Sequence, residues 1–375
     1  MMNRQKNKPV LFRITNNLKV GGVQRRLRAL LPLLTEHYEV HIVTYKVKGV
    51  FFDELAERGV HTHFMPRKGH WSPVAIWKLA QLFRKHKADI VHTHSFGGNI
   101  FGILAAALAR VPVRIGQMHS RGLHWYGTTA LRRKKQILEE TIVHRLFSHK
   151  VLFVSRESKK FFQSQTGLPD SMLQVLYNGL HFPAKIERAT RAELNIPENK
   201  ALIGFVGRLT KGKGVERFIE MAEEASRQAP GRFHFTVIGD GERLAGLKKW
   251  TQEHGLTHEI TFLGERSDIH RCYAALDMLV FCSDPDIEGM PGVVLEACAH
   301  GLPILAIKDA PLEEICEHYE RIIFINASEP IVEQIEKTLL QPQVNPSKFF
   351  QEFSIEAMRD RTICVYESLS LEKAT

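Results

Sequence analysis

The sequence predicts an α/β protein built from two doubly wound domains, each a parallel sheet wrapped by helices. First, 375 residues are too many for one ordinary hydrophobic core. Second, short β-branched apolar runs alternate with helix-like segments, which is typical of parallel sheets. Third, this alternation is interrupted once, by residues rich in charge and turn formers. We therefore expect an N-terminal domain at 1–182, a linker at 183–200, a C-terminal domain at 201–352, and a last helix at 353–375 that can cross back to the first domain.

The N-terminal domain shows seven strand-like runs. They are Val10–Thr15, Val40–Thr44, His61–Met65, Asp89–His94, Val113–Met118, Lys150–Val154 and Leu173–Tyr177. The helix-like segments between them include Val23–Glu36, Pro73–Lys87, Asn99–Ala109 and Thr129–Phe147. Ser72 marks the start of one of these helices, because its hydroxyl can cap the helix and proline follows at the first helical position.

The alternation restarts in the C-terminal domain. Its expected strands are Ala201–Val206, Phe233–Ile238, Ile260–Leu263, Met278–Phe281, Ile304–Ile307 and Ile322–Ile325, and Ile355–Leu369 is typical of a helix. When two such domains face each other, ligands bind in the central cleft, at the carboxyl ends of the strands. The loops that follow the strands are therefore the place to look for functional residues.

Composition excludes several classes of protein. Apolar residues make up 44% and charged residues 25%, as in soluble globular proteins, which excludes wholesale disorder and fibrous chains. No apolar run reaches the roughly 18 residues of a membrane span, and the basic N-terminus is not followed by a signal-peptide core. The five cysteines are widely spaced without a C-x-x-C pair, so we expect reduced thiols in a cytoplasmic protein.

Charge is divided unequally between the two halves of the chain. Residues 1–182 contain 29 Lys and Arg against 10 Asp and Glu, whereas residues 183–375 contain 22 against 31. A basic half joined to an acidic half favours an anionic partner, which can be nucleic acid, a phosphorylated substrate or a membrane surface. No nucleic-acid-binding motif accompanies the basic residues, so we expect no nucleic acid partner.

Glycine turns follow several of the expected strands. Gly21 and Gly22 follow the first strand and open the first helix, where free N–H groups and partial positive charge suit a phosphate. Gly239 follows the strand Phe233–Ile238 in the same way. Each turn taken alone is weak evidence, because a glycine pair is more often only a turn.

A more distinctive loop follows the strand Ala201–Val206. Its sequence, Gly207-Arg208-Leu209-Thr210-Lys211-Gly212-Lys213-Gly214, places two cations among three glycines. Arg208 and Lys213 can neutralise a diphosphate and stabilise it as it leaves. The structural alternative is an ordinary loop with solvated charges.

Two glutamates eight positions apart frame another glycine-containing segment, Glu288-Gly289-Met290-Pro291-Gly292-Val293-Val294-Leu295-Glu296. It runs from a loop after the strand Met278–Phe281 into a helix. Free N–H groups near Gly289–Gly292 can bind a phosphate or a sugar hydroxyl, and the two carboxylates can accept hydrogen bonds from hydroxyl pairs of a bound nucleotide sugar. A carboxylate inside an apolar helix such as Glu296 requires a partner.

Together, the two-glutamate segment, the Gly207–Gly214 loop, the Gly21-Gly22 pair and Asn178-Gly179-Leu180 resemble glycosyltransferase family 4. The similarity spans nearly the whole chain, in the order and spacing of the family. It implies the GT-B fold, with two Rossmann-like domains facing a central cleft. One departure is His181, which stands where the family commonly has Asp after Asn-Gly-x.

The resemblance implies two overlapping sets of site residues. Those implied in catalysis are Glu288, His119, Arg208 and Lys213. Those implied in donor binding are Gly21, Gly22, Arg208, Lys213, Gly239, Glu265, Arg266, Glu288, Gly289, Met290, Pro291, Gly292 and Glu296. In this scheme the cations hold the diphosphate, Glu296 binds the ribose hydroxyls, and Glu288 and His119 lie beside the transferred sugar.

The resemblance also implies a hexosyltransferase-type enzyme. It would move a hexose or N-acetylhexosamine, with retention, from a nucleotide-diphosphate sugar (a UDP-sugar favoured) to a glycan or lipid-linked glycan, in bacterial lipopolysaccharide, capsule or exopolysaccharide assembly. Two alternatives stay open: a sugar-nucleotide epimerase of the same fold, and a non-catalytic nucleotide-sugar-binding protein.

Three motifs raise the question of a metal ion. Asp284-Pro285-Asp286 has the D-x-D spacing of a metal site, but the resemblance implies a metal-free enzyme without a cofactor. His61-Thr62-His63 and His92-Thr93-His94 each place two imidazoles on one strand face, with no obvious third ligand. We therefore expect no metal ion.

Basic clusters lie beside aromatic residues at two places in the N-terminal domain. One is the helix Pro73–Lys87, which carries Trp77 and Phe83 and ends in basic residues; the other is Arg132-Arg133-Lys134-Lys135, shortly after Trp125-Tyr126. This combination suits an anionic membrane surface, so peripheral attachment to the inner face of the plasma membrane is the expectation. The alternative is that the aromatic rings pack in the core.

Overall fold

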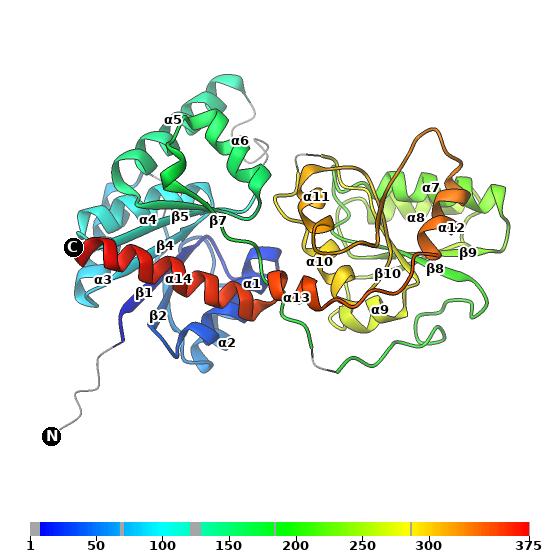
Figure 1. The fold of residues 1–375 in the computed structure, drawn as a ribbon, viewed down its shortest axis with the longest axis horizontal. Helices are drawn as coiled ribbons and strands as arrows, with labels where there is room; N and C mark the ends of the chain where they lie inside the picture. Colours follow the sequence, from blue (N-terminus) through cyan, green and yellow to red (C-terminus); the bar gives the residue numbers. More distant parts are fainter. Residues whose placement is uncertain (1–7, 68–70, 121–128, 184, 286, 375) are drawn as a thin grey trace. The chain divides into compact units, whose positions relative to one another are not determined.

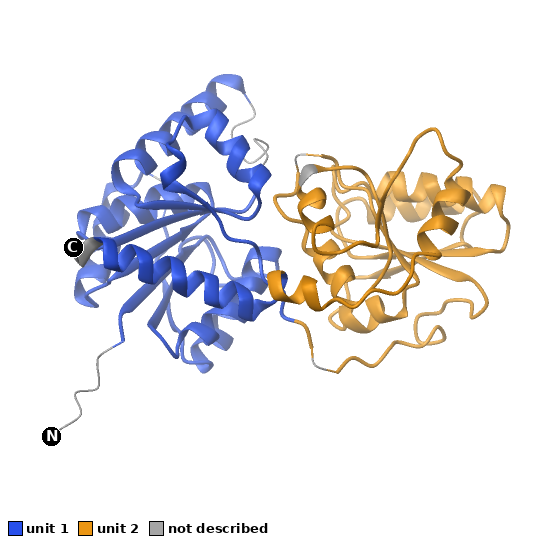
Figure 2. Ribbon diagram, in the orientation of Figure 1, with its two compact units in different colours: residues 1–181, 353–375 blue, residues 182–352 orange. Residues whose placement is uncertain are grey.

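The computed structural model describes residues 8–67, 71–120, 129–183, 185–285 and 287–374. The chain forms two compact units (Figure 2): unit 1 is Met1–His181 with Phe353–Thr375, and unit 2 is Phe182–Glu352. Each unit contains one sheet of parallel strands covered by helices (Figure 1). The predicted α/β class, with two doubly wound sheets, is confirmed.

Unit 1 is built on a seven-stranded sheet in the order β3-β2-β1-β4-β5-β6-β7. Its strands are β1 Val10–Thr15, β2 Glu39–Thr44, β3 His61–Phe64, β4 Ile90–His94, β5 Val113–Met118, β6 Lys150–Phe153 and β7 Leu173–Val175. Its helices are α1 Gly22–Leu34, α2 Phe51–Glu57, α3 Pro73–Lys85, α4 Phe96–Leu108, α5 Ala130–Phe147, α6 Arg156–Thr166 and α14 Ile355–Ala374. The strand order reverses between β1 and β4, which is where ligands bind in sheets of this type.

Local sequence signals set the helix starts. The Ser72 hydroxyl accepts a hydrogen bond from the Ala75 amide at 3.4 Å, and Pro73 occupies the first position of α3. This is the start that the sequence predicts. In α6, Ser155 caps the Ser158 amide at 3.1 Å, and Gly167 ends the helix in the left-handed conformation.

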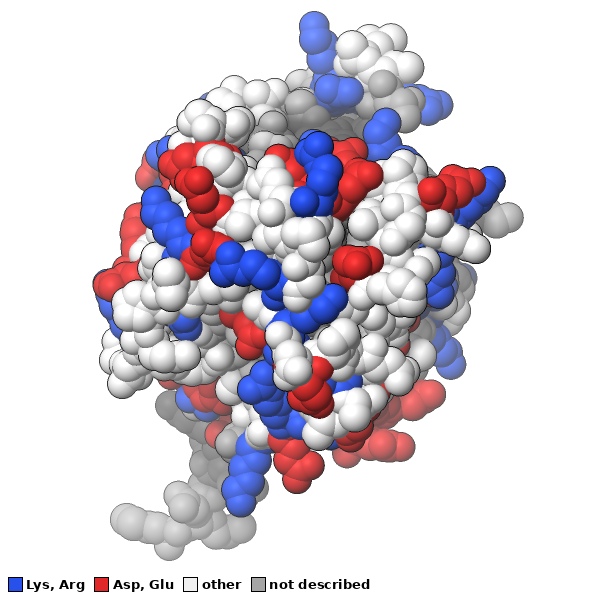
Figure 3. All heavy atoms as spheres, turned by 90° about the vertical axis from the view of Figure 1, so that its right-hand side faces the viewer, with Lys and Arg blue, Asp and Glu red and all other residues white. Residues whose placement is uncertain are grey.

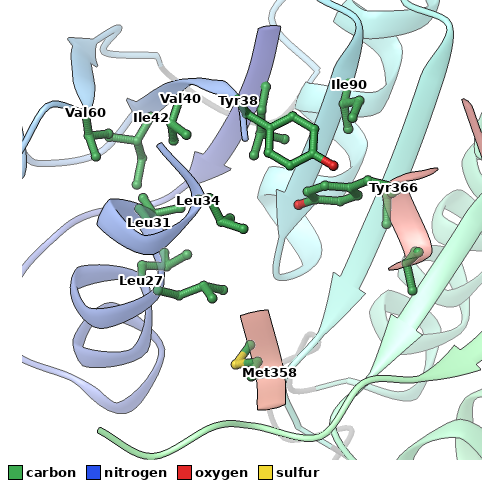
Figure 4. Close-up of a cluster of buried hydrophobic side chains, with 14 of the residues drawn as sticks. Leu27, Leu31, Leu34, Tyr38, Val40, Ile42, Val60, Ile90, Met358 and Tyr366 are labelled. Atoms are coloured by element: carbon green, nitrogen blue, oxygen red, sulfur yellow. The ribbon is translucent and has the colours of Figure 1, made fainter. Parts of the chain in front are cut away.

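Successive side chains of β1 point to opposite faces of the sheet and so contribute to two separate core layers of unit 1. Leu11 packs with α1, α2 and α14, whereas Phe12 and Ile14 pack with α3 and α4 on the other face. Figure 4 shows the first layer, where the rings of Tyr38 and Tyr366 meet edge to face at 5.6 Å. Tyr366 comes from α14, so the far end of the sequence completes this core.

The two separate segments of unit 1 are joined by backbone hydrogen bonds. The Leu180 amide donates to the Phe353 carbonyl at 2.7 Å, and the Ile355 amide donates to the Leu180 carbonyl at 2.9 Å. A Cβ on Gly179 would lie 2.6 Å from the Ser354 carbonyl oxygen. The Asn-Gly-Leu motif therefore allows the close approach of these two segments.

Unit 2 is built on a six-stranded sheet in the order β10-β9-β8-β11-β12-β13. Its strands are β8 Ala201–Val206, β9 Phe233–Ile238, β10 Ile260–Gly264, β11 Met278–Phe281, β12 Ile304–Ala306 and β13 Ile322–Phe324. Its helices are α7 Val215–Gln228, α8 Leu244–Glu253, α9 Ile269–Ala275, α10 Gly292–Ala299, α11 Ala310–Cys316, α12 Ile331–Leu339 and α13 Ser347–Phe353. The surface in Figure 3 intermingles acidic and basic side chains.

The segment expected as a linker belongs to unit 2 and packs against the rest of that unit. Arg191 donates to the Asp277 carboxylate at 2.8 Å, and the Ala189 amide donates to the Arg271 carbonyl at 3.2 Å. Leu194 and Ile196 are buried. Residues 185–200 are therefore held in place although they form no helix or strand among those described.

Candidate functional site

Three loops at the carboxyl ends of β8, β9 and β10 are joined by backbone hydrogen bonds. The Gly207 amide donates to the Ile238 carbonyl at 3.0 Å, and the Leu209 amide donates to the Asp240 carbonyl at 2.9 Å. The Gly239 amide donates to the Gly264 carbonyl at 2.8 Å. The loop predicted to bind a diphosphate is therefore held by the loop after β9, which is in turn held by the end of β10.

Glycine is required at two points of this arrangement. Gly239 has φ of +142°, and a Cβ there would lie 1.9 Å from the Gly207 carbonyl oxygen. Gly214 has φ of +78°, and a Cβ there would lie 1.8 Å from the Cys282 carbonyl oxygen. No side chain fits at such distances, so these glycines let the loops pack backbone to backbone.

The two motifs with the strongest sequence signal meet in an ion pair. Lys213, from the glycine-rich loop, pairs its Nζ with a carboxylate oxygen of Glu288. Both side chains are largely enclosed, with 16% and 22% of their surfaces exposed. A donor phosphate that engages Lys213 would therefore act next to the carboxylate that is predicted to contact the sugar.

A second ion pair, which the sequence reasoning missed, braces the same loops. Arg217, near the start of α7, pairs with Asp284 and donates to the Cys282 carbonyl at 3.0 Å. The Asp284 amide in turn donates to the Gly212 carbonyl at 2.8 Å. Asp284 is thus held by a cation; Asp286, the other carboxylate of the D-x-D motif, lies outside the described residues.

Arg208 differs from Lys213 in its surroundings. Its side chain is exposed, and it forms no ion pair with the residues that the structure describes. A guanidinium in this state at the end of β8 is available to an anionic ligand.

The second glutamate of the motif is oriented by a tyrosine. Glu296 lies in α10, and its Oε2 accepts a hydrogen bond of 2.9 Å from the hydroxyl of Tyr273, a buried residue of α9. The partner that a carboxylate in an apolar helix requires is therefore present. Sequence reasoning had no signal for Tyr273, because α9 precedes the motif by a whole strand.

The residues between the two glutamates form the entrance of α10. Gly289, Met290 and Pro291 are buried, and the helix begins at the half-buried Gly292. Met290 is only 3% exposed, so its side chain belongs to the core. This segment can therefore contact a ligand through the free backbone N–H groups at the start of α10.

The loop after β10 carries Glu265 and Arg266, two of the residues implied in donor binding. Glu265 is exposed, whereas Arg266 forms two hydrogen bonds with Asp268, at 2.8 and 2.7 Å. These bonds hold the pKa of Asp268 below its usual range. With the Arg266 side chain engaged in this way, the backbone N–H and C=O groups of the loop are what it can offer a ligand.

Unit 1 holds the other predicted residues. Gly21 and Gly22 connect β1 to α1, and α1 starts at Gly22. The guanidinium of Arg26 lies over this start, since a Cβ on Gly22 would lie 3.4 Å from its Nη2. Arg26 is a cation at the predicted phosphate position that the sequence reasoning missed, although its place one turn into the helix was a possible signal.

His119, after β5, ends a buried chain of hydrogen bonds. Arg13 Nε donates to His94 Nε2 at 3.0 Å, and His94 Nδ1 lies 2.8 Å from His119 Nε2. Arg13 and His94 are almost fully buried.

This chain determines which nitrogen of His119 carries the proton. Arginine can only donate, so His94 Nε2 accepts, and the proton of neutral His94 is on Nδ1. His94 therefore donates to His119 Nε2, and His119 carries its own proton on Nδ1. No described residue accepts that proton.

His119 is also kept neutral. Burial, with the positive charges of Arg26 and Arg13, lowers its pKa to about 3. At neutral pH the side chain therefore presents an uncharged N–H donor.

The same arginine ties the chain to α14. Arg13 Nη1 lies 2.9 Å from His92 Nδ1 and donates to the hydroxyl of Tyr366. His92 and His94, considered above as metal ligands, are thus partners of a buried guanidinium.

Comparison with known proteins places both halves of the chain in one class. Residues 20–181 match the family model "Glycosyltransferase Family 4", and residues 186–353 match "Glycosyl transferases group 1". The chain is 28% identical over 304 residues, 76% of each chain, to the UDP-Gal:alpha-D-GlcNAc-diphosphoundecaprenol alpha-1,3-galactosyltransferase of Escherichia coli. It is 23% identical over 314 residues to the capsular polysaccharide biosynthesis glycosyltransferase CapH of Staphylococcus aureus, covering 83% of this chain and 84% of CapH.

A solved structure supports the same fold. Anabaena HepE in complex with UDP and glucose superposes with a TM-score of 0.78 at 19% identity, covering 96% of this chain and 99% of HepE. The sheets, the glycine-rich loops and the two matched family models agree. The chain therefore belongs to glycosyltransferase family 4 and is a glycosyltransferase of the GT-B fold.

Proposed function

We propose that this enzyme transfers a hexose or N-acetylhexosamine from a UDP-sugar, with retention of configuration, to a glycan or lipid-linked glycan during assembly of a bacterial surface polysaccharide. The observation that carries the donor site is the Lys213–Glu288 ion pair on loops that are fixed to one another. The names of the E. coli and S. aureus relatives support a UDP-sugar donor, a diphosphate-lipid acceptor and a polysaccharide product.

The donor is held by charge and by oriented hydrogen-bonding groups. Arg208 and Lys213 bind the diphosphate, and Glu296, positioned by Tyr273, accepts hydrogen bonds from the ribose hydroxyls. Glu288 contacts the transferred sugar.

Retention without a protein nucleophile follows a front-face course. The leaving diphosphate oxygen accepts the proton of the acceptor hydroxyl while the sugar passes through an oxocarbenium-like state. The two cations stabilise the charge that develops on the diphosphate. His119 donates its Nδ1–H to a sugar hydroxyl without adding positive charge beside that state.

A donor screen tests this proposal. Calorimetry with UDP-, GDP- and ADP-sugars is expected to detect binding of a UDP-sugar, and NMR of the product anomeric centre is expected to show retention. Binding of none of these donors contradicts the donor site, and an inverted product contradicts the mechanism. Donor conversion to its epimer without acceptor supports the epimerase alternative.

The proposed reaction needs no metal ion, because Arg208 and Lys213 can neutralise the diphosphate. Activity is expected to survive excess EDTA, and Asp284→Asn combined with Asp286→Asn is expected to lower it only slightly. A strict Mg²⁺ or Mn²⁺ requirement that these substitutions abolish would assign a metal to the D-x-D motif instead.

A lipid-linked acceptor requires access to a membrane, and α5 offers a surface for it. Leu131, Leu138, Ile142 and Leu146 are 46–80% exposed. At 3.6 residues per turn these four positions lie within about 80° of one another, on one face of the helix. The exposed side chains of Arg132, Lys134 and Arg145 flank this face, and the exposed Lys135 lies within it.

We propose that this face of α5 rests on an anionic bilayer, with its apolar residues at the acyl boundary and its cations among the phosphates. Of the aromatic residues predicted to help, Trp77 is about half exposed, as is Trp71 just ahead of α3, whereas Phe83 is buried in the core. Trp125 and Tyr126 lie outside the described residues. No described helix is long and apolar enough to cross a membrane.

Liposome co-sedimentation tests the membrane surface. The wild-type protein is expected to bind anionic vesicles at low salt. Binding is expected to be clearly weaker at high salt and on neutral vesicles. The double variant Leu138→Ser with Ile142→Ser is also expected to bind anionic vesicles clearly less. Leu340→Ser, at an exposed leucine of unit 2, is the matched control and should bind like wild type. Equal binding of the α5 variant and the control would contradict the proposal.

A further inference from the structure

Five polar side chains gather at the edge of the unit 1 sheet opposite the glycosyltransferase residues. Glu39 and His41 lie on β2, and His61 and His63 are the first and third residues of β3. His86 follows α3. Gly21, Gly22 and His119 follow the carboxyl ends of their strands, whereas Glu39 and His61 are the first residues of theirs. This cluster therefore serves no step of the proposed transfer.

The register of the sheet brings the histidines together. His41 pairs with His61 across the β2–β3 ladder, and His63 is two residues further along the same face. The His41 ring stacks on His61 at 4.6 Å and on His63 at 5.2 Å, and His41 is 1% exposed. The first histidine of the H-x-H pattern on β3 thus lies beside a histidine of the neighbouring strand.

Three groups of the cluster are close enough to share one ion. The ligand atoms offered by Glu39, His41 and His61 all lie within 4.8 Å of one another. Two imidazoles and a carboxylate are a ligand set that suits Zn²⁺, with a water in the fourth position. We propose that Glu39, His41 and His61 form a zinc site that stabilises the amino-terminal edge of the unit 1 sheet.

His63 contacts the proposed ligand His41 and would orient its ring. His41 Nε2 lies 2.9 Å from Glu39 Oε1, and His41 Nδ1 lies 2.9 Å from His63 Nε2. When Zn²⁺ takes His41 Nε2, the imidazole proton moves to Nδ1, and His63 Nε2 accepts its hydrogen bond. Metal-bound histidines usually donate their other N–H in this way.

The charge of this cluster and its access from the surface both favour binding of a cation. Glu39 supplies the negative charge. A hollow of ≈ 790 Å³, lined in part by Glu39, His61 and His86, leads to the ligands from the surface. Lys8, Lys87 and Asp89 also line it, so that with Glu39 the lining contains two basic and two acidic side chains.

Metal titration of the chelator-treated full chain tests the site without any assay of transfer. Zn²⁺ is expected to bind at one equivalent by calorimetry and to raise the melting temperature. Co²⁺ is expected to give the visible absorption of a four-coordinate ion. Absence of stoichiometric binding would overturn the proposal.

Variants then locate the site. Glu39→Gln and His61→Asn alter exposed side chains and should fold; each is expected to weaken Zn²⁺ binding at least tenfold. His63→Gln is expected to weaken it by roughly tenfold through the hydrogen bond to His41. His258→Asn, at an exposed histidine of unit 2, is the control. Wild-type affinity in both Glu39→Gln and His61→Asn would assign the ion to another place and overturn the site.

Discussion

At the scale of single residues, Lys213 and Glu288 depend on each other. Each neutralises the other within a largely enclosed ion pair, so removing one leaves an uncompensated charge beside the diphosphate position. Loss of a charge-assisted contact costs roughly 1.5–3 kcal/mol. Lys213→Ala and Glu288→Ala are each expected to lower kcat/KM at least tenfold.

Steady-state kinetics with the donor found by the screen measures this effect. Lys211→Ala, at an exposed lysine of the same loop, is the matched control and should keep near-normal turnover. A folded Lys213→Ala protein with wild-type kcat/KM would remove this loop from the donor site.

The tautomer of His119 is a second property that can be measured directly. Nitrogen-15 NMR of the imidazole rings is expected to show His119 protonated at Nδ1 only, without titration between pH 5 and 8, because its pKa is about 3. In His94→Phe the donor to His119 Nε2 is gone, and both tautomers are expected. A wild-type ring protonated at Nε2 would contradict the hydrogen-bond order from Arg13.

At the scale of elements, the packing of two loops depends on Gly214. Alanine there combines a φ of +78° with a Cβ 1.8 Å from the Cys282 carbonyl oxygen, so the loop must move away from β11. Gly214→Ala is expected to weaken nucleotide binding at least tenfold and to lower the melting temperature.

Calorimetry measures nucleotide binding and thermal unfolding measures stability, and a second glycine variant shows whether the effect is specific to Gly214. Gly246 lies within α8 with no heavy atom within 4 Å of an added Cβ. Gly246→Ala should therefore stabilise the protein by about 0.5–1 kcal/mol and leave binding unchanged. If Gly214→Ala and Gly246→Ala had the same nucleotide affinity and melting temperature, the close approach at Gly214 would not be needed for donor binding.

The elements themselves were predictable because their signals are local. Each strand of the structure lies at a run predicted from β-branched residues, with ends that differ by at most a few positions. The start of α3 followed from Ser72 and Pro73 in the same way. The parallel, two-sheet class then followed from the alternation.

Contacts between distant segments were not predictable. Tyr273 reaches Glu296 from another helix, and Arg217 reaches Asp284 from α7. Likewise, His41 stands next to His61 only because β2 and β3 pair in one particular register. A motif identifies residues along one segment, whereas these partners are set by tertiary packing.

At the scale of the whole molecule, buried histidines make stability depend on pH. Burial lowers the pKa of His119 to about 3 and those of His144, His234 and His300 to about 4. The unfolded chain, with histidine pKa values near 6.5, therefore binds more protons than the folded chain between about pH 4 and 6.5. Stability is expected to fall as pH decreases through this window, by up to about 1.4 kcal/mol per pH unit for each histidine.

Urea unfolding at pH 7.5, 6.5 and 5.5 measures this dependence. The midpoint should change little between the first two values and fall clearly at the third. His144→Gln is expected to reduce the fall. A midpoint that is the same at pH 5.5 as at pH 7.5 would mean that these histidines are not buried in neutral form.

The return of α14 to unit 1 has a consequence for the order in which the protein can be completed during synthesis. Tyr366 and Met358 leave the ribosome only after the whole of 182–352 has been made. At about 5–20 residues per second this takes on the order of ten to thirty seconds. During that time the nascent N-terminal segment lacks one side of its core, and Arg13 lacks the tyrosine hydroxyl that it contacts in the finished protein. The core of unit 1 can therefore be completed only late in translation, after unit 2 has had time to fold.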